Sequence, residues 1–229
     1  ELLPEREAFL DKLNSVGIPG VRYNAKPSVK CGITGTHVAV TVFGEEEESA
    51  DYGHGHKHDN HGHEHHHEHH GHAHAHDHGH GHSHGHAHSS MHDIEHLVRD
   101  HLDLSPKVKD DVIAVYRLIA EAESKAHGVP VPEIHFHEVG TLDAVADVAA
   151  VCMLMEQIAP DRVIASPVHV GSGQVRCAHG ILPVPAPATA HILRDVPIYG
   201  GSIKGELCTP TGAALLKHFA DSFGEMPVM

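Results

Sequence analysis

The sequence predicts an α/β protein, with a mixed or parallel sheet and flanking helices, that is interrupted by a disordered His-rich loop. Segments with helical spacing of apolar residues alternate with short β-branched segments, which is the order typical of α/β folds. Apolar residues make up 40 % of the 229 residues, enough for a hydrophobic core. Between residues 45 and 90 apolar residues almost vanish, so that segment cannot offset the entropy cost of becoming ordered.

Four segments are predicted to be helices: residues 2–17, 106–126, 141–158 and 210–221. Ser105-Pro106 and Thr209-Pro210 each place a capping residue before a proline, which suits the first helical position. Gly128 is a predicted helix end. The apolar stripes expected to face the core are Leu3, Phe9, Leu10 and Leu13; Val108, Val112, Val115, Ile119 and Ala122; and Val145, Val148, Ala149, Cys152 and Met155.

Three segments are predicted to be extended: residues 36–43, 131–137 and 162–165. The 44 residues before the His-rich segment are too few to fold alone. We therefore predict that residues 1–44 and 91–229 form one α/β domain, a fragment of a longer protein. Residues 45–90 are predicted to be a disordered metal-binding insertion within it.

The charge balance excludes several classes of partner. There are 16 Lys and Arg residues against 31 Asp and Glu residues, which argues against nucleic acid and anionic membrane surfaces as partners. No apolar run approaches the length of about 18 residues that a membrane span needs, and no signal peptide is visible. The four cysteines (Cys31, Cys152, Cys177 and Cys208) lack the spacing of a disulfide framework. A cytoplasmic protein with free thiols is expected.

Histidine is the outstanding residue type, with 30 copies in the chain. Nineteen of them form a tract: His54, His56, His58, His61, His63, His65, His66, His67, His69, His70, His72, His74, His76, His78, His80, His82, His84, His86 and His88. Neutral imidazole binds borderline metals such as nickel, copper and zinc. A flexible tract imposes no fixed geometry, so we expect a metal reservoir rather than a catalytic site. A neutral spacer, a pH-dependent charged loop or a purification tag are the alternative interpretations.

A fixed metal site is predicted in the ordered part of the chain. His135 and His137 flank Phe136 in an extended segment, so both imidazoles should point the same way. Asp143 and Asp147 follow on one face of the next predicted helix. The alternative is a hydrogen-bonded histidine pair beside carboxylates that stabilise a helix N-terminus.

Two further motifs complete the set of candidate residues. Residues 171–180 combine glycines with Arg176, a candidate phosphate clamp, and with Cys177 and His179, candidate metal ligands. Residues 206–212 place hydroxyl groups at a helix start, where an anion could bind. A Gly- and Pro-shaped loop and simple helix capping are the respective alternatives. The sequence contains neither a P-loop nor a His-Glu-x-x-His motif, so a GTPase or a zincin hydrolase is unsupported.

Four strings resemble a known family: IHFHEVGTLDAVAD (134–147), ASPVHVGSGQVRCAHGILPVPAPAT (165–189), YGG (199–201) and ELCTPTGAAL (206–215). They are similar to the nickel insertion proteins of nickel-pincer cofactor biosynthesis, the LarC family, whose members also carry an internal His-rich tract. The resemblance covers nearly the whole chain. It departs from the family at both ends, because the usual N-terminal Ser-Gly-Ile-Ser-Gly-Asp-Met-like loop and the C-terminal CTP-binding region are absent from this sequence.

The resemblance implies a nickel insertion cyclometallase, a chelatase-like lyase that depends on CTP and on Mn(II) or Mg(II). Its reaction places Ni(II) in pyridinium-3,5-bisthiocarboxylic acid mononucleotide, giving the cofactor of lactate racemase and related enzymes. The expected partners are this small-molecule precursor and the apoenzyme that accepts the cofactor. CTP and its metal are expected to bind mainly in the absent C-terminal region, so this chain alone is expected to be incomplete.

Residue roles are assigned from chemistry. The tract would collect nickel and pass it to a fixed site of His135, His137, Asp143, Asp147, Cys177 and His179. His137 or Glu138 would remove the ring proton, and Arg176 would bind the anionic mononucleotide and act with them in catalysis. Ser172, Thr209 and Thr211 are candidate substrate contacts. The alternative function is non-catalytic storage or delivery of nickel or zinc.

Overall fold

The chain forms six α-helices and thirteen strands in the ranges that the computed structural model describes, which are residues 3–46, 89–136, 138–177 and 179–225. The helices are α1 (Arg6–Ser15), α2 (Met91–His96), α3 (Pro106–His127), α4 (Leu142–Ile158), α5 (Pro187–Ile192) and α6 (Pro210–Phe219), with a π-helical turn at Leu97–His101 and 3-10 turns at Val131–Glu133 and Glu138–Gly140. The strands are β1 (Val21–Lys30), β2 (Ile33–Val42), β3 (Glu45–Glu46), β4 (Ser89–Ser90), β5 (His135–Phe136), β6 (Ile164–Ala165), β7 (Val168–His169), β8 (Gly171–Ser172), β9 (Gln174–Cys177), β10 (Gly180–Pro183), β11 (Ile198–Tyr199), β12 (Gly205–Glu206) and β13 (Ser222–Phe223).

The centre of the molecule is the pair of long helices that the sequence predicts. The hydroxyl of Ser105 accepts a hydrogen bond from the Val108 N–H at 3.2 Å and so caps α3. Gly128 ends α3 in the left-handed conformation. The predicted stripes of α3 and α4 are buried, except that Met155 is only partly buried while its neighbour Met153 faces the core. α3 contacts α4, α5 and α6, which places the hydrophobic core around it.

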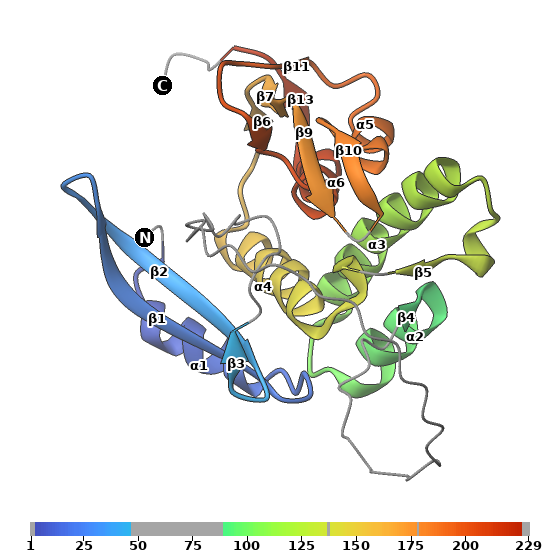
Figure 1. Cartoon of the computed structure of the whole chain (residues 1–229). Coiled ribbons are helices and arrows are strands. Elements are labelled where there is room, and N and C mark those ends of the chain that lie inside the picture. The colour runs from blue at the N-terminus through green and yellow to red at the C-terminus, as the bar shows by residue number, and fades with distance from the viewer. Residues whose placement is uncertain (1–2, 47–88, 137, 178, 226–229) are drawn as a thin grey trace, which may run out of the picture.

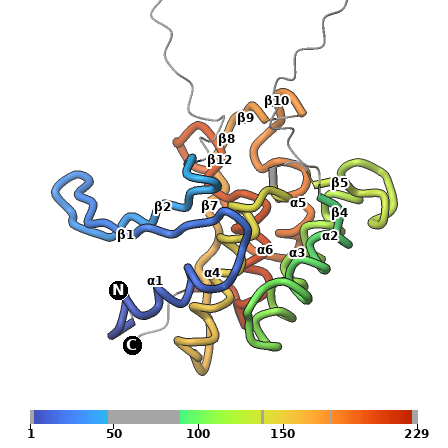
Figure 2. The backbone as a smooth tube through the Cα atoms, turned by 90° about the horizontal axis from the view of Figure 1, so that it is seen from below, coloured from blue at the N-terminus to red at the C-terminus, as the bar shows by residue number. Residues whose placement is uncertain are grey.

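The N-terminal hairpin extends from this core as a two-stranded arm (Figure 1). β1 and β2 pair antiparallel over their whole length, and β3 adds a short third strand at the base. α1 contacts β1, and α4 contacts both long strands. Seen from below, α4 lies between this hairpin and α3 (Figure 2). β2 confirms the predicted strand at 36–43. β1 was not predicted, because Pro27 and five exposed residues in its centre and end break the alternation of buried and exposed side chains that is typical of a strand.

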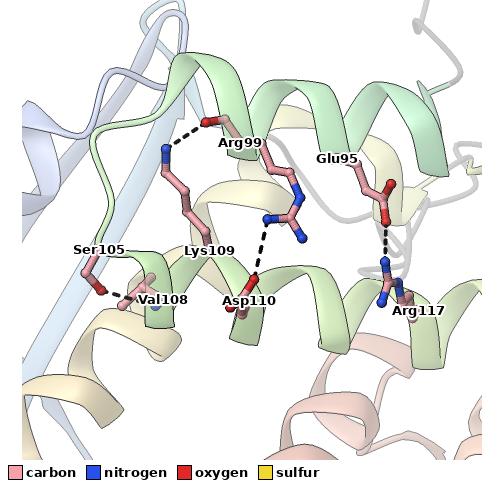
Figure 3. Close-up of polar contacts among 7 residues, drawn as sticks. All are labelled: Glu95, Arg99, Ser105, Val108, Lys109, Asp110 and Arg117. Atoms are coloured by element: carbon pink, nitrogen blue, oxygen red, sulfur yellow. Dashed lines mark hydrogen bonds and ion pairs between the residues drawn. The ribbon is translucent and has the colours of Figure 1, made fainter.

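α2 and the π-helical turn after it pack on α3 through the buried Ile94 and Val98, with ion pairs at the surface (Figure 3). Arg117 on α3 lies 2.9 Å from Glu95 on α2, and Arg99 lies 3.4 Å from Asp110. Lys109 donates a hydrogen bond of 2.7 Å to the Arg99 carbonyl. α2 begins directly after β4, so this packing joins the chain after the His-rich tract to the core.

The C-terminal third forms small sheets above the helices (Figure 1). β7 with β11 and β6 with β13 are parallel pairs, while β8 with β12 and β9 with β10 are antiparallel. The predicted mixed α/β class is confirmed, with the strand pairing divided among several small sheets. No helix in the described ranges is both long and apolar enough to cross a membrane.

Several predicted boundaries differ from the structure. The helix expected at 2–17 covers only Arg6–Ser15, since Pro4 lies before its first turn. The segment predicted to be extended at 131–137 begins with a 3-10 turn and forms a strand only at residues 135–136. Of the strand predicted at 162–165, only the last two residues form a strand in the structure. At the ends of the predicted insertion, residues 45–46 and 89–90 belong to strands. The 19-histidine tract lies outside the described residues.

Candidate functional site

The three motifs singled out in the sequence meet at one cavity of about 1290 Å³. One wall comes from α1 and the β1–β2 hairpin, the floor from α3 and α4, and the opposite wall from β9, β10 and the start of α6. The hairpin and the C-terminal third flank α4 in the view of Figure 1. Residues far apart in the sequence therefore face a common space that exceeds the volume of about 300–1,000 Å³ usual for small-molecule sites.

Two carboxylates of α4 line this cavity, as their spacing of four residues predicts. Burial, and secondly the nearby Asp143 carboxylate, raise the pKa of Asp147 above its ordinary value. The Asp143 Oδ1 atom is buried and has no hydrogen-bond partner among the described residues. Tyr23 on β1 donates a hydrogen bond of 2.8 Å to the Ala146 carbonyl and so fixes this face of α4 against the hairpin.

The segment around His135 is positioned by two aromatic residues. Phe136 is buried, and its ring contacts that of Tyr116 edge to face with centroids 5.7 Å apart. The Tyr116 hydroxyl donates a hydrogen bond of 3.0 Å to the Val139 carbonyl. His135 lines the cavity. His137 lies outside the described residues, and so does the side chain of Glu138.

Successive side chains of β9 point to opposite faces, and this separates the candidate site residues of segment 171–180. Val175 and Cys177 line the cavity, and His179 in the turn before β10 lines it too. Arg176 is exposed and is absent from the cavity lining, because successive side chains of a strand point to opposite faces. The predicted phosphate clamp therefore lies away from the wall that carries the predicted metal ligands.

Of the three hydroxyl groups predicted to contact the substrate, two line the cavity and one does not. Thr209 and Thr211 line the cavity at the start of α6, and the Thr209 hydroxyl caps the helix by accepting a hydrogen bond of 3.3 Å from the Gly212 N–H. Ser172 is not in the lining, and its hydroxyl donates to the Ile203 carbonyl at 2.8 Å. The capping role expected as the alternative at Thr209 is thus present, and Thr211 is the second hydroxyl group at the same wall.

Five charged or titratable residues of the lining were not among the predicted site residues: Arg6, Tyr23, Glu123, His127 and Glu206. Glu123 and His127 stand four residues apart at the end of the helix predicted over 106–126, so their spacing was a readable signal. Arg6 carried no such signal, because its approach depends on how α1 packs against the hairpin. It is the one Lys or Arg among the described residues of the lining.

The lining offers nitrogen, sulfur and oxygen donors beside a large apolar surface. Its described carboxylates (Glu123, Asp143, Asp147 and Glu206) outnumber the single cation, so the cavity attracts positive charge. Imidazole, thiol and carboxylate groups together suit a borderline divalent metal. Within the described ranges, no three His, Cys, Asp or Glu side chains already form a group that could hold a metal ion.

The family described as "Nickel insertion protein" matches residues 1–229. Among curated proteins, the "Pyridinium-3,5-bisthiocarboxylic acid mononucleotide nickel insertion protein" of Clostridium kluyveri is 39 % identical over 224 residues, which is 95 % of this chain and 48 % of that protein. Proteins of the same description from Desulfitobacterium hafniense and Geobacillus kaustophilus are each 42 % identical over 60 % of this chain, and over 37 % and 33 % of their own lengths. The chain thus spans between a third and a half of the length of these relatives. No solved structure matches the chain.

Proposed function

This chain belongs to the nickel insertion protein family, and from that premise we propose that it takes part in inserting Ni(II) into pyridinium-3,5-bisthiocarboxylic acid mononucleotide. The single observation that carries the proposal is the cavity, which is lined by potential metal-binding side chains from three separate motifs. The names of two relatives with 42 % identity contain this substrate, and their similarity to the present chain supports the same reaction.

Two regions divide the work in this proposal. The histidine tract gathers nickel, and the cavity performs the chemistry. Forming a nickel–carbon bond requires the metal to be held in a definite position against one ring carbon, and positioning of that kind comes from packed elements. The cavity is built on α3 and α4, the most deeply buried helices, whereas the tract has almost no apolar residues.

The insertion step needs a base. The ring carbon loses its proton to the base, and the electron pair of the broken C–H bond forms the bond to nickel, so atoms and charge balance without a redox partner. His137 and Glu138 are the proposed bases. His135, His137, Asp143, Asp147, Cys177 and His179 are the proposed ligands that pass Ni(II), which is a substrate here, to the two sulfur atoms of the precursor.

The phosphate of the precursor needs a cation or hydrogen-bond donors. Thr209 and Thr211 are proposed to contact the precursor from inside the cavity. Arg176 and Ser172 stay proposed contacts for a part of the precursor that lies outside this lining, because neither faces the cavity. The CTP dependence, the Mn(II) or Mg(II) requirement, the lyase class and the cofactor-accepting apoenzyme are proposed from the family resemblance.

The test is cofactor formation by the whole protein with precursor, CTP, Mn(II) and excess nickel. His137→Ala is expected to abolish formation, and Arg176→Ala is expected to lower it strongly. Arg6→Ala tests whether Arg6, which lines the cavity, binds the phosphate of the precursor in place of Arg176. Replacing the tract should leave most of the rate, since free nickel is in excess. His92→Ala is the matched control, because the His92 side chain is 87 % exposed on α2.

Wild-type rates in both His137→Ala and Arg176→Ala would show that these loops are only scaffolding. A whole protein that binds nickel and forms no cofactor would instead support storage or delivery. Each variant is first compared with the wild type by thermal unfolding, because the segment around His135 packs against the core through Phe136.

A further inference from the structure

Two histidines meet at the end of the cavity where α3 ends. His127 is the last residue of α3, and His179 lies in the turn between β9 and β10. Both side chains line the cavity. Their rings are in edge-to-face contact, with centroids 4.8 Å apart and an angle of 60° between the ring planes. Residues separated by 52 positions in the sequence thus bring two imidazoles together at the wall of the site.

A carboxylate orients one of these rings. Glu123 lies one turn before His127 on α3, and its Oε2 atom is 3.3 Å from the His127 Nε2 atom. The Glu123 side chain is 19 % exposed and that of His127 is 38 % exposed. If the neutral ring donates its Nε2–H to this carboxylate, the lone pair at Nδ1 is left to bind a metal. Histidine ligands in metal sites are commonly held by such a carboxylate.

We infer that His127 and His179 form a two-nitrogen docking site for the Ni(II) ion on its way to the precursor, with Glu123 as a positioning residue. The inference rests on the proposed function, and it assigns residues that the sequence motifs do not connect. Two imidazoles bound to one metal through nitrogen atoms at about 2.1 Å have their ring centroids about 5 Å apart. The observed separation of 4.8 Å is close to that distance, so the two rings are near enough to share one metal ion.

The small number of ligands suits a metal that must be released. A closed site of four protein donors holds its metal permanently, whereas open positions allow exchange. Two protein nitrogens leave positions for the two sulfur atoms and the ring carbon of the precursor. The described residues contain no preformed group of three donors, in agreement with a site that the substrate completes.

The competing explanation is purely structural. A histidine at a helix C-terminus, paired with a glutamate one turn earlier, stabilises the helix with or without a metal. The two explanations differ in one measurable quantity, the rise in melting temperature that nickel causes. A ligand that binds the folded chain and not the unfolded chain raises stability, and a ligand that binds both states equally does not.

The experiment measures the melting temperature of the metal-free whole protein with and without Ni(II), and with Mg(II) as the metal control. Nickel is expected to raise the wild-type melting temperature by several degrees. His127→Ala and His179→Ala should lose most of that rise, while His92→Ala should keep it. The tract is present in every variant, so its own nickel binding cancels in the comparison. His127→Cys keeps a donor for a borderline metal and should recover part of the rise.

Glu123→Gln tests the positioning role. It keeps a hydrogen-bond acceptor near His127 but removes the charge, so the nickel concentration for half-maximal stabilisation should rise by about tenfold. A fall in the metal-free melting temperature, with an unchanged nickel-induced rise in His127→Ala and His179→Ala, would overturn the docking site. Cofactor formation by a wild type without any nickel-induced rise would also overturn it, while leaving the proposed function standing. A histidine-dependent rise in a protein that makes no cofactor would reject the function and retain the site.

Discussion

The pKa of the Asp147 carboxyl group depends on its surroundings in the cavity wall. Burial, then the Asp143 carboxylate, raise its folded-state pKa above the ordinary value of 3.8, so the folded chain holds this proton to higher pH than the unfolded chain. Its contribution to stability therefore falls as pH rises from the ordinary pKa through the folded one. Asp147→Asn removes that penalty. Relative to the wild type, the variant should gain stability as pH rises from the ordinary pKa of 3.8 through the raised folded-state pKa, measured by metal-free thermal unfolding. A difference that is independent of pH would contradict this prediction.

Tyr116 joins the core to the segment that carries His135. Its hydroxyl donates to the Val139 carbonyl at 3.0 Å and its side chain is fully buried. Tyr116→Phe leaves that carbonyl without this partner, and we expect a loss of about 1–3 kcal/mol in the free energy of unfolding. Chemical denaturation measures the loss. Tyr199→Phe is the matched control, since Tyr199 is 50 % exposed, and its effect should stay below about 0.5 kcal/mol. Equal effects in the two variants would be evidence against the contact.

At the scale of elements, the small sheets of the C-terminal third depend on close backbone approach. Gly171 in β8 has a φ of +86°, and a Cβ atom there would overlap the carbonyl oxygen of Gly205 in the paired strand. Gly171→Ala should cost more than about 2 kcal/mol, because it combines a strained backbone with a steric clash. Gly35→Ala in β2 is the control, since nothing lies within 4 Å of its added Cβ. Similar unfolding curves for both variants would argue against this pairing of β8 with β12.

At the scale of the whole molecule, the insertion and the domain should be separable. Ser90 caps α2 through a reciprocal hydrogen-bond pair with Asp93, and Ser89 and Ser90 pair with β5. A replacement should therefore span residues 50–88 and leave both serines in place. With a Gly/Ser linker there, the cooperative thermal transition should remain within a few degrees of the wild type, because the segment contributes almost no apolar side chains. An insoluble or non-cooperative product would show that the segment packs against the domain.

The same replacement tests the reservoir. With 19 histidines between His54 and His88, the wild type should bind several nickel ions that the replaced protein does not bind. Titration calorimetry measures the stoichiometry, and an unchanged value would reject the reservoir. Metal should dissociate as pH falls through about 6.5, because protonated imidazole has no lone pair to donate.

The sequence by itself determined the parts of this protein that depend on neighbouring residues. The bounds of α3 follow from its Ser105 cap and the Gly128 at its end. α4 follows from its stripe of apolar residues three and four apart, which is buried except at Met155. The family membership could likewise be read from contiguous motifs, and Asp143 and Asp147 share a cavity because one helix carries both. Such features lie within a few residues of each other along the chain, so local physics specifies them.

Only the tertiary structure decided which elements face one another across the cavity. β1 appears as a strand because β2 supplies its hydrogen-bond partners, and Arg176 points away from the cavity because of the register of β9. The meeting of His127 with His179 arises because β9 and β10 come to lie beside the end of α3. Those placements depend on how buried stripes from distant segments fit together, and no local pattern of residues carries that information.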